Sequence, residues 1–414
     1  MLEQLYNIYL RSRAVTTDSR RITPGCVFFA LKGETFDGNQ FARQALQQGA
    51  ALAVVSDPAL EGVEGCLRVD DVLQTLQDLA RHHREHLHIP VIGITGTNGK
   101  TTTKELVREV LQKRYRVHAT TGNYNNHLGV PLTLLAMPEE TEIAIIEMGA
   151  NHPGEIDFLC RIAQPTCGLI TSVGKAHLEG FGSFEGVVQT KTELYRYLCG
   201  SLFVSADNAI LMRESLGMSR KTYGSELVAD VKGSCAGANP YMKFYFEDND
   251  NVYTVQTQLL GAYNFDNAMA AVCVGRHFGV DLFDIKEALE AYTPTNNRSQ
   301  YKETQRNRLI LDCYNANPSS MKVALDNFLS MPGDRKVAIL GSMKELGADS
   351  PREHQAIVDR LQESGVEHIL VGPEFGGMST EEVLVRLREH PIEGALILVK
   401  GSNSNRLWTL EEAL

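Results

Sequence analysis

The chain has 414 residues, of which 43% are hydrophobic and 22% charged, so it is long enough for two or three globular domains. Its net charge of −11 disfavours sequence-independent binding to nucleic acid, which requires a basic surface. An anionic ligand must therefore be held by local cationic side chains and helix N-termini rather than by the overall field.

The targeting and cysteine patterns predict a cytoplasmic protein. The first ten residues show no basic segment followed by an apolar core, and no apolar run approaches the roughly 18 residues that cross a bilayer. We therefore expect neither a signal peptide nor membrane insertion. Eight cysteines are scattered without a Cys-x-x-Cys pair, which is typical of reduced thiols rather than of disulfides or a zinc site.

The first segment, residues 1–84, is predicted to be a small α/β domain. Apolar runs at 27–31 and 51–55 predict strands, and residues 41–48 have helical spacing. Near its end, His82 and His86 are one helical turn apart, a spacing that can bind zinc. The His-Glu-x-x-His order of a catalytic zinc helix is missing, so we interpret this cluster as the polar end of a helix.

A phosphate-binding turn opens the second segment, residues 85–292. Residues 89–94 predict a buried strand, and Thr101 begins a stretch with helical spacing. The turn between them contains Gly96, Thr97, Asn98 and Gly99. Its backbone N–H groups can point at a phosphate, Lys100 can reach the β- and γ-phosphates, and the Thr101 hydroxyl can ligate Mg²⁺. Although the first glycine of the strict pattern is replaced by Ile94, this context predicts a nucleoside triphosphate site.

Further strands in this segment predict a parallel α/β sheet. The candidates lie at 143–146, 168–172 and 202–204, while 241–246 and 252–257 predict a β-hairpin attached to the sheet. Glu147 follows the first of these strands, where open α/β sheets place ligand-binding residues, and its carboxylate suits Mg²⁺. His177 and Lys191 come later. Taken alone, each of the three has an ordinary explanation as a solvated or satisfied polar side chain.

The third segment, residues 293–414, is again predicted to be α/β. Its strands are expected at 309–311, 336–340, 368–371 and 395–399. The fold class is therefore α/β with three domains, in which a central P-loop parallel sheet is flanked by the first and third segments.

Several motifs resemble the Mur ligase family. They include the Gly-Thr-Asn-Gly-Lys-Thr loop, the stretch that begins at Glu147, and the stretch 176–183 around His177. Further matches lie at 17–20, 28–33, 37–41, 121–135, 264–271, 312–321, 341–347 and 399–402. They run through all three segments in the family's order. The resemblance implies an N-terminal UDP-sugar domain (1–84), a central ATP-binding domain (85–292) and a C-terminal Rossmann-like ligase domain (293–414).

The resemblance also implies roles at the ATP end. Lys100 and Thr101 would hold the γ-phosphate and a first Mg²⁺ that Glu147 shares, and His177 would help bind a second Mg²⁺. Lys191 matches a position that can be carbamylated in the family, which would turn its ammonium group into an anion. Lys100, Glu147, His177 and Lys191 form the implied catalytic set. The implied ATP-binding residues are Gly96, Thr97, Asn98, Gly99, Lys100, Thr101 and Thr102, with Asn267 at the adenine and Arg298 and Asp312 from the third domain.

Within the family, the chain resembles the branch that joins D-Ala-D-Ala to UDP-N-acetylmuramoyl-tripeptide in peptidoglycan precursor synthesis. The tripeptide carboxylate would attack the γ-phosphorus of ATP, and the dipeptide amine would then displace phosphate from the acyl phosphate. The implied substrate residues are Ser19, Arg20 and Lys32 at the UDP-sugar end, together with Asn125, Asn126, Asn315 and Asn317. A monomer is implied, with a third domain that closes to exclude water about a hinge at 293–297.

Three other functions remain open. A sister Mur ligase or a ligase like folylpolyglutamate synthetase would share the ATP chemistry, but Asn-Ala-Asn-Pro at 315–318 and the lack of Asp-Asn-Pro-Arg favour the dipeptide-adding branch. A nucleotide-dependent binding or switch protein would not need a second metal site. A small-molecule kinase would release a stable phosphorylated product and would need no amine acceptor.

Overall fold

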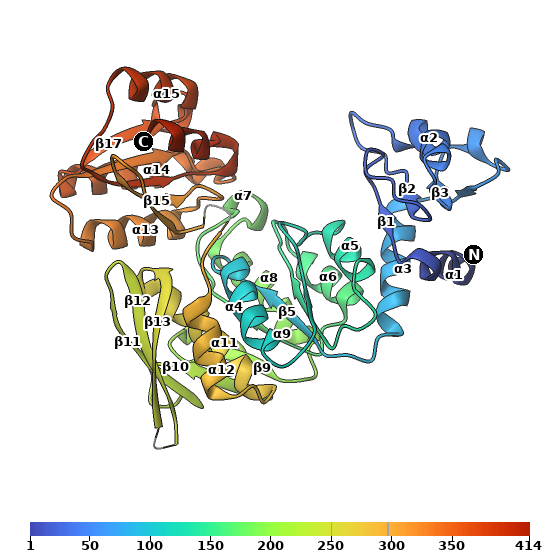
Figure 1. Ribbon diagram of the computed structural model, residues 1–414, viewed down its shortest axis with the longest axis horizontal. Coiled ribbons are helices and arrows are strands. Elements are labelled where there is room, and N and C mark those ends of the chain that lie inside the picture. The colour runs from blue at the N-terminus through green and yellow to red at the C-terminus, as the bar shows by residue number, and fades with distance from the viewer. Residues whose placement is uncertain (250, 296–297) are drawn as a thin grey trace.

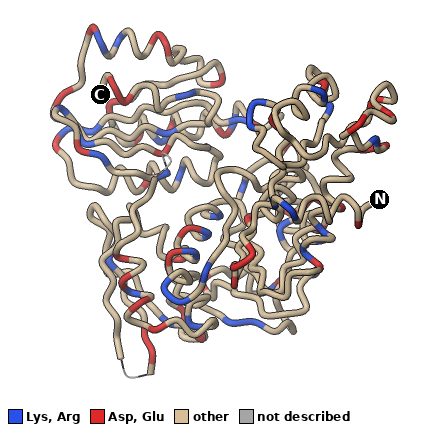
Figure 2. Tube along the Cα trace, turned by 45° about the vertical axis from the view of Figure 1, so that its right-hand side comes forward, with Lys and Arg blue, Asp and Glu red and all other residues tan. Residues whose placement is uncertain are grey.

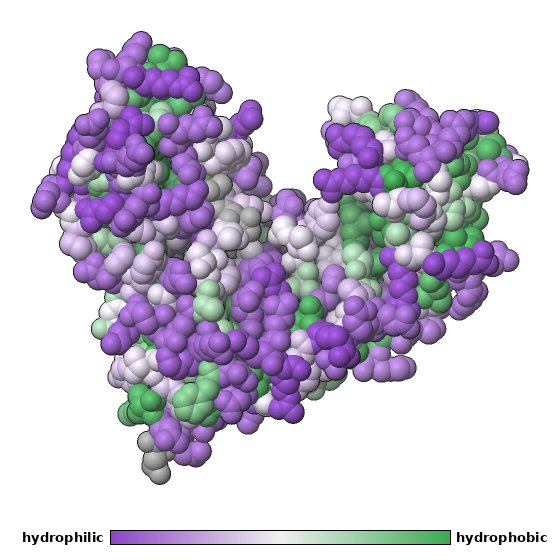
Figure 3. Space-filling model, viewed as in Figure 1, coloured by the Kyte–Doolittle hydropathy of each residue, from purple (hydrophilic) through white to green (hydrophobic). Residues whose placement is uncertain are grey.

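The computed structural model describes residues 1–249, 251–295 and 298–414, and within these ranges the chain forms three α/β parts, each with its own sheet. The middle part lies between the other two (Figure 1). The N-terminal and C-terminal parts rise from it on opposite sides, and a broad notch separates their surfaces (Figure 3).

The N-terminal sheet is parallel throughout, in the order β1-β2-β3-β4. Its elements are β1 (Val15–Thr16), β2 (Val27–Phe29), β3 (Leu52–Val55) and β4 (Cys66–Arg68), with helix α2 (Ala42–Gln47) between β2 and β3. The strands predicted at 27–31 and 51–55 and the helix predicted at 41–48 are confirmed, with small shifts at their ends. β1 and β4 are too short for hydrophobic periodicity to reveal them.

Two helices attach this part to the middle one. Helix α3 (Val72–Glu85) packs against α1 (Leu2–Ser12) and also against α5 (Gly129–Leu135) and α6 (Glu155–Ala163) of the middle part. The Tyr9 hydroxyl donates to the Leu135 carbonyl over 3.0 Å, and Arg84 donates to the carbonyls of Ala163 and Gln164. The N-terminal part is therefore anchored through a shared apolar core.

The histidine cluster lies on α3. The ring of Tyr6 packs against those of His82 and His86, and the Nδ1 atom of His86 lies 2.7 Å from the His82 carbonyl oxygen. Within the described ranges, no group of three or more His, Cys, Asp or Glu side chains is arranged to hold a metal ion. The packing against Tyr6 gives these histidines a structural role at the end of the helix.

The middle sheet has the order β13-β12-β11-β10-β9-β8-β5-β7-β6. Its strands are β5 (Val91–Thr95), β6 (Val117–Ala119), β7 (Ile143–Glu147), β8 (Cys167–Ile170), β9 (Leu202–Ser205), β10 (Arg220–Gly224), β11 (Val231–Ala238), β12 (Tyr241–Asp248) and β13 (Asn251–Leu260). The strands from β6 to β11 pair in parallel, whereas β11, β12 and β13 are antiparallel to one another. The predicted parallel sheet and its attached hairpin are thus confirmed.

Helices cover this sheet on both faces, which explains why its central strand β5 is apolar and buried along its whole length. On one face, α4 (Lys100–Gln112) packs against α11 (Phe265–His277) and α12 (Leu282–Ala291). The other helices of the middle part are α7 (Leu178–Phe181), α8 (Phe184–Lys191), α9 (Glu193–Tyr197) and α10 (Ala209–Glu214).

The C-terminal sheet has the order β14-β15-β18-β16-β17, and only the edge strand β14 is antiparallel. Its strands are β14 (Gln300–Glu303), β15 (Arg308–Asp312), β16 (Lys336–Gly341), β17 (Glu367–Val371) and β18 (Leu396–Lys400), with helices α13 (Pro318–Ser330), α14 (Ser350–Ser364) and α15 (Thr380–Glu389). All four predicted strands are confirmed. Positions 296 and 297 of the predicted hinge lie outside the described residues.

Two further observations concern membrane spans and cysteines. No helix in the described part of the chain is long and apolar enough to cross a membrane. All eight cysteines are free thiols, and most of them are buried.

Candidate active site

A cavity of about 720 Å³ lies where the middle and C-terminal parts meet. Its wall combines the turn between β5 and α4, the segments that follow β7 and β8, the start of α11, and the segment between β15 and α13. Most of the predicted site residues line it. They are Thr97, Asn98, Gly99, Lys100, Thr101, Thr102, Asn125, Asn126, Glu147, His177, Asn267, Arg298, Asp312, Asn315 and Asn317.

The phosphate-binding turn requires glycine at two positions. Gly96 has φ 142° and Gly99 has φ 82°, a backbone region that other residues rarely adopt. A Cβ atom on Gly96 would lie 2.1 Å from the Thr171 Oγ1 atom, and one on Gly99 would lie 2.5 Å from the Asn267 Oδ1 atom. The turn is therefore pressed against its neighbours, which fixes the direction of its N–H groups at the start of α4.

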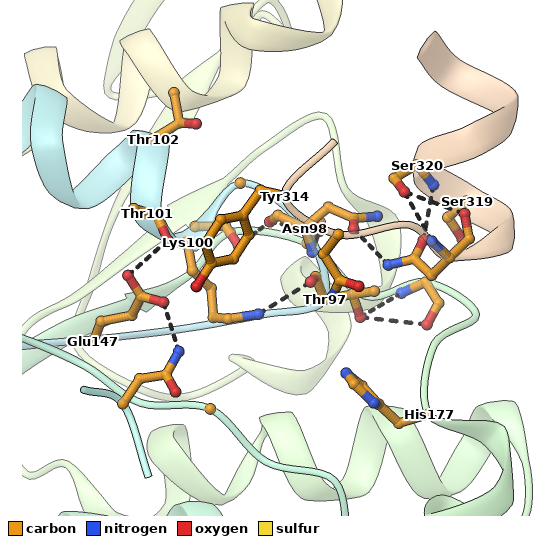
Figure 4. Close-up of a pocket in the computed structure, with 18 of the residues that line it drawn as sticks. Thr97, Asn98, Lys100, Thr101, Thr102, Glu147, His177, Tyr314, Ser319 and Ser320 are labelled. Atoms are coloured by element: carbon orange, nitrogen blue, oxygen red, sulfur yellow. Dashed lines mark hydrogen bonds between the residues drawn. The ribbon is translucent and has the colours of Figure 1, made fainter. Parts of the chain in front are cut away.

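Lys100 is the first residue of α4, and its ammonium group lies over the turn. The Nζ atom donates to the carbonyl oxygens of Gly96 over 2.6 Å and Thr97 over 3.1 Å (Figure 4). Burial lowers the pKa of this lysine, while the Glu147 carboxylate opposes the shift. A half-buried ammonium group whose partners are neutral carbonyl oxygens can bind a phosphate anion more strongly than it binds those partners.

Glu147 links the phosphate turn to the segment before α5. Its Oε2 atom accepts the Thr101 hydroxyl over 2.9 Å, and its Oε1 atom accepts the Asn125 amide over 2.8 Å. The Glu147 side chain is almost fully buried, and its backbone N–H donates to the Thr120 hydroxyl. A carboxylate and a hydroxyl beside a phosphate turn match the oxygen ligands that Mg²⁺ prefers.

Hydrogen bonds from the turn to the C-terminal part cross the cavity. The Asn317 amide donates to the Asn98 Oδ1 atom over 2.8 Å, and Asn317 also caps the start of α13. The Asn98 backbone is held in turn by the Ser172 and Thr171 hydroxyls. The start of α13 therefore contacts the phosphate turn directly.

His177 meets the C-terminal part at a second place. Its Nδ1 atom lies against the carboxylate of Glu345, and a hydrogen bond from His177 lowers the pKa of that carboxyl group. Nearby, Lys175 pairs with Glu353 of α14 over 3.2 Å, and its backbone N–H donates to the Ser319 hydroxyl. His177 thus lies at the domain interface, some way from the contacts of Glu147 (Figure 4).

Lys191 is buried beside the cavity but is not part of its lining. Its Nζ atom donates to the Ala150 carbonyl over 3.2 Å and lies 5.1 Å from the centre of the Phe181 ring. Burial, reinforced by the positive charge of Lys100, lowers the pKa of Lys191 to about 7. Near neutral pH a large share of this lysine is therefore an uncharged amine, which can act as a nucleophile.

The remaining wall combines residues of α11 and of the C-terminal part. The Asn267 Oδ1 atom accepts the Thr103 hydroxyl over 3.0 Å, and its Nδ2 atom donates to Asn264 over 2.8 Å. The Arg298 guanidinium stacks 3.7 Å from the centre of the Tyr314 ring. Aromatic and amide groups of this kind suit a flat, polar nucleobase.

Asp312 lies at the end of β15 and is paired with a buried cation. The Lys400 Nζ atom of β18 donates to the Asp312 Oδ2 atom over 2.6 Å, and the Ser299 backbone N–H donates to Oδ1 over 3.3 Å. Lys400 is 1% exposed, so the pair is fixed inside the C-terminal part.

The predicted UDP-sugar residues lie elsewhere, in the N-terminal part. Ser19, Arg20 and Lys32 are absent from the wall of the cavity. The Arg20 guanidinium donates two hydrogen bonds to Asp18, and Lys32 Nζ lies 3.6 Å from Asp37 Oδ2. Both cations are largely exposed, with side chains 87% and 68% accessible. The structure brings the other candidates together at the cavity, with Gly96 and Lys191 beside its lining, but not these three.

The structure adds residues that the motifs did not single out. Tyr314, Lys400 and Glu345 contact predicted residues, and each of these three belongs to a C-terminal motif that matched the family. Asn126 lines the cavity, but its side chain also accepts the N–H groups of Leu128 and Gly129 at the start of α5. Asn126 therefore has a local structural role at the start of α5 in addition to its place in the cavity wall.

Charge is mixed over the molecule as a whole. Figure 2 shows acidic and basic residues interspersed along all three parts, with no large basic face in this view. The cationic side chains at the cavity, chiefly Lys100 and Arg298, therefore supply the attraction for an anion, as the net charge of −11 requires.

A phosphate turn faced by a second α/β domain that bonds to it defines a nucleotide-dependent enzyme built from several domains. The sequence matches three described domains: "Mur ligase family, catalytic domain" at residues 12–84, "Mur ligase middle domain" at 94–275, and "Mur ligase, glutamate ligase domain" at 297–397. A Bacillus subtilis relative, UDP-N-acetylmuramoyl-tripeptide–D-alanyl-D-alanine ligase, is 35% identical over 95% of this chain and 91% of its own. The chain belongs to the Mur ligase family and is an ATP-dependent ligase.

Solved structures agree with this assignment. A crystal structure of MurF from Acinetobacter baumannii has a TM-score of 0.87 and 32% identity, and covers 96% of this chain and 92% of its own. MurF ligase from Thermotoga maritima in complex with ADP has a TM-score of 0.84 and 29% identity, over 98% of this chain and 97% of that one. The expected three-domain α/β architecture is therefore confirmed over almost the full length.

Proposed function

We propose that this ligase joins D-Ala-D-Ala to the terminal carboxylate of UDP-N-acetylmuramoyl-tripeptide with consumption of ATP. The observation that carries the proposal is the continuous cavity in which the phosphate turn faces the C-terminal part across the Asn98–Asn317 hydrogen bond. Full-length relatives named for this reaction support it. The product would serve peptidoglycan synthesis, and so cell wall growth, shape and division.

Lys100 and the turn would carry the first step. The tripeptide carboxylate attacks the γ-phosphorus, the bond to the β-phosphate oxygen breaks, and an acyl phosphate and ADP form. Lys100 can exchange its two carbonyl partners for phosphate oxygens and so offset the repulsion between two anions. The N–H groups fixed by Gly96 and Gly99 would orient the triphosphate.

The residues present suit Mg²⁺ at the phosphates. Thr101 and Glu147 supply a hydroxyl and a carboxylate that already touch, and the remaining ligands would be phosphate oxygens and water. His177 is the candidate beside a second ion, where its pairing with Glu345 fixes the orientation of its ring. Bound Mg²⁺ would screen the charge of the phosphates and polarise the transferring group.

Lys191 fits the expected carbamate. Its uncharged amine can attack CO₂ to form a C–N bond, and loss of a proton then leaves an anionic carbamate. The pKa of about 7 makes this amine available near neutral pH. The product would replace a buried positive charge beside Lys100 with a negative one, which removes the repulsion that lowers the pKa.

The second step would occur at the start of α13. The D-Ala-D-Ala amine attacks the acyl carbon, and phosphate leaves from the tetrahedral intermediate. We place the dipeptide near Asn315 and Asn317, whose helix bonds to the phosphate turn, so that closure excludes water. Ser19, Arg20 and Lys32 would hold the UDP-sugar end. We expect the enzyme to act as a monomer in the cytoplasm.

The decisive experiment measures phosphate release from MgATP with UDP-N-acetylmuramoyl-tripeptide, with and without D-Ala-D-Ala, and identifies products by mass. We expect phosphate release that depends on the dipeptide and a UDP-linked pentapeptide. Phosphate release without any coupled product would favour a switch, and a stable phosphorylated product would indicate a kinase. Coupling of a single amino acid instead would indicate a sister ligase. Each of these results would overturn the proposal.

A further inference from the structure

A second contact joins the phosphate turn to the C-terminal part, through the segment that follows β8. The Thr97 hydroxyl accepts the N–H of Gly174 over 3.0 Å and donates to its carbonyl oxygen over 3.3 Å. The next residue, Lys175, reaches across the interface, because its backbone N–H donates to the Ser319 hydroxyl over 3.0 Å in the first turn of α13. The turn is therefore joined to α13 by this route as well as by a direct side-chain hydrogen bond.

Glycine at position 174 is explained by this contact rather than by its backbone. Gly174 has an ordinary φ, unlike the two glycines of the phosphate turn. A Cβ atom there would lie 2.8 Å from the Ser319 Oγ atom and 3.3 Å from the Ser319 Cβ atom, while the next atom, Cγ2 of Thr97, would be at an ordinary 3.6 Å. Ser319 could avoid such a methyl group only by turning its hydroxyl away from the Lys175 N–H. The small residue at 174 therefore serves the docking of the C-terminal part, not the fold of the middle one.

An ion pair beside this contact crosses the same interface. The Lys175 Nζ atom lies 3.2 Å from the Oε1 atom of Glu353 in α14. The Glu353 side chain is largely buried and also pairs with Arg352, whereas the Lys175 side chain is about half exposed. A pair with this exposure adds a modest attraction, which salt weakens. Backbone and side chain of Lys175 therefore both favour the docked arrangement, and the side chain can be changed without altering the backbone contact.

We propose that Gly174 and Lys175 form a clasp that holds α13 against the phosphate turn and so limits the loss of the acyl phosphate to water. Both are positioning residues, because they act through Ser319 and Glu353. The inference rests on the proposed function, in which the acyl phosphate forms at the turn. When the clasp is open, water can attack the acyl carbon in place of the dipeptide amine. The bond from that carbon to the phosphate oxygen then breaks, and the tripeptide carboxylate, phosphate and a proton are released without an amide bond.

The test measures phosphate released per pentapeptide formed from MgATP, UDP-N-acetylmuramoyl-tripeptide and D-Ala-D-Ala. Gly174→Ala should raise this ratio about tenfold over wild type, because the new methyl group costs both the Ser319 hydrogen bond and the close approach of α13. Lys175→Met removes only the ion pair and should raise the ratio about twofold. Gly333→Ala is the matched control and should keep the wild-type ratio, since Gly333 also has an ordinary φ and a Cβ atom there would meet its nearest neighbours at 3.5 Å.

Small-angle X-ray scattering with ADP gives a readout that does not require ligation, and Gly174→Ala should increase the radius of gyration. Ser319→Gly removes both atoms that the new methyl group would meet, so adding Gly174→Ala to Ser319→Gly should change neither the radius nor the ratio further.

An unchanged radius or an unchanged ratio in Gly174→Ala would overturn the inference, as would an equal effect of this change with and without Ser319→Gly. A wild type that forms no pentapeptide would refute the proposed function and, with it, the part of the clasp in protecting the acyl phosphate. The scattering cycle would still decide whether Gly174 controls docking.

Discussion

The phosphate turn (residues 96–99) with Thr101 and Glu147 differs from the predicted UDP-sugar residues Arg20 and Lys32. The difference lies in how far folding alone fixes the side chains. Thr101 and Glu147 are 8% and 1% exposed and are bonded to each other. Arg20 and Lys32 are exposed and paired only with acids near them in sequence. A buried, interlocked set is built during folding, whereas an exposed set must gain its order from the substrate. Changes in the two regions should therefore differ in size and in the kinetic constant that they alter.

The largest effect is expected for Lys100→Met. This change removes the cation of the phosphate turn but keeps an apolar stem of similar length, so kcat/KM for ATP should fall by about a thousandfold or more. The measurement is steady-state phosphate release, with circular dichroism as the check on folding. Lys113→Met, at the far end of the same helix and paired with an exposed glutamate, is the control and should stay within threefold of wild type. Comparable losses in both variants would contradict a specific role for Lys100.

Lys191→Met separates activity from stability. Loss of the amine should reduce kcat by a hundredfold or more, because no carbamate can form. Measured without CO₂, so that Lys191 carries a free amine, the same change should raise the free energy of unfolding by about 1–3 kcal/mol, since it replaces a buried ionisable group with an apolar chain. Burial lowers the pKa of Lys191 from 10.5 to about 7, so the folded protein binds this proton less tightly than the unfolded chain does. Lys191 therefore destabilises the folded protein at pH values below 10.5, and methionine removes this cost.

Lys191→Arg is the matched control. It keeps the positive charge and cannot form a carbamate, so it should be inactive without the gain in stability. Carbon-13 NMR of the wild type with labelled bicarbonate should show a carbamate signal that is absent in both variants. An active Lys191→Met enzyme would remove this residue from the mechanism.

Arg20→Ala should affect substrate binding alone. We expect the KM for the UDP-linked tripeptide to rise about tenfold, which corresponds to about 1.4 kcal/mol, with kcat and the KM for ATP nearly unchanged. Arg21→Ala, one residue away and also exposed, is the control. A lower kcat in Arg20→Ala would contradict the contrast drawn above. It would mean that the UDP-sugar residues take part in more than binding the substrate.

The sequence predicted the strand, the turn and the helix around Lys100 because their signals are local. An apolar strand, a glycine turn and a helix are contiguous at 89–111, so Lys100 and Thr101 could be placed without tertiary information. The Glu345 contact arises where the C-terminal part meets the middle one, the Lys400 contact where two distant strands pair, and the Tyr314 contact between the segments that flank β14 and β15. No spacing rule reports such tertiary contacts. Strands β6, β10 and β11 were missed for a different reason, since they are short or carry polar and glycine residues.

The smallest effect concerns the anchor between the N-terminal and middle parts, where the two regions of the comparison are joined. His83 is buried on α3 with its Nδ1 atom 3.2 Å from the Tyr6 hydroxyl, and burial lowers its pKa to about 4. The unfolded chain binds a proton at this residue near pH 6.5 but the folded protein does not, so stability is complete above pH 6.5 and is lost as the pH falls toward 4. From pH 7.5 to 5.5 this one residue should account for about 1 kcal/mol.

Urea unfolding at pH 7.5, 6.5 and 5.5 measures this contribution. His83→Gln should flatten the pH dependence, because glutamine does not titrate, whereas the exposed His390→Gln should leave the slope as in wild type. An unchanged slope in His83→Gln would mean that acid acts elsewhere in the molecule. A flattened slope would show that the N-terminal part depends on a neutral histidine for its attachment. The UDP-sugar residues would then belong to a part whose attachment through α3 loses stability at acid pH. The contact between Thr101 and Glu147 does not involve His83 and should not depend on its protonation.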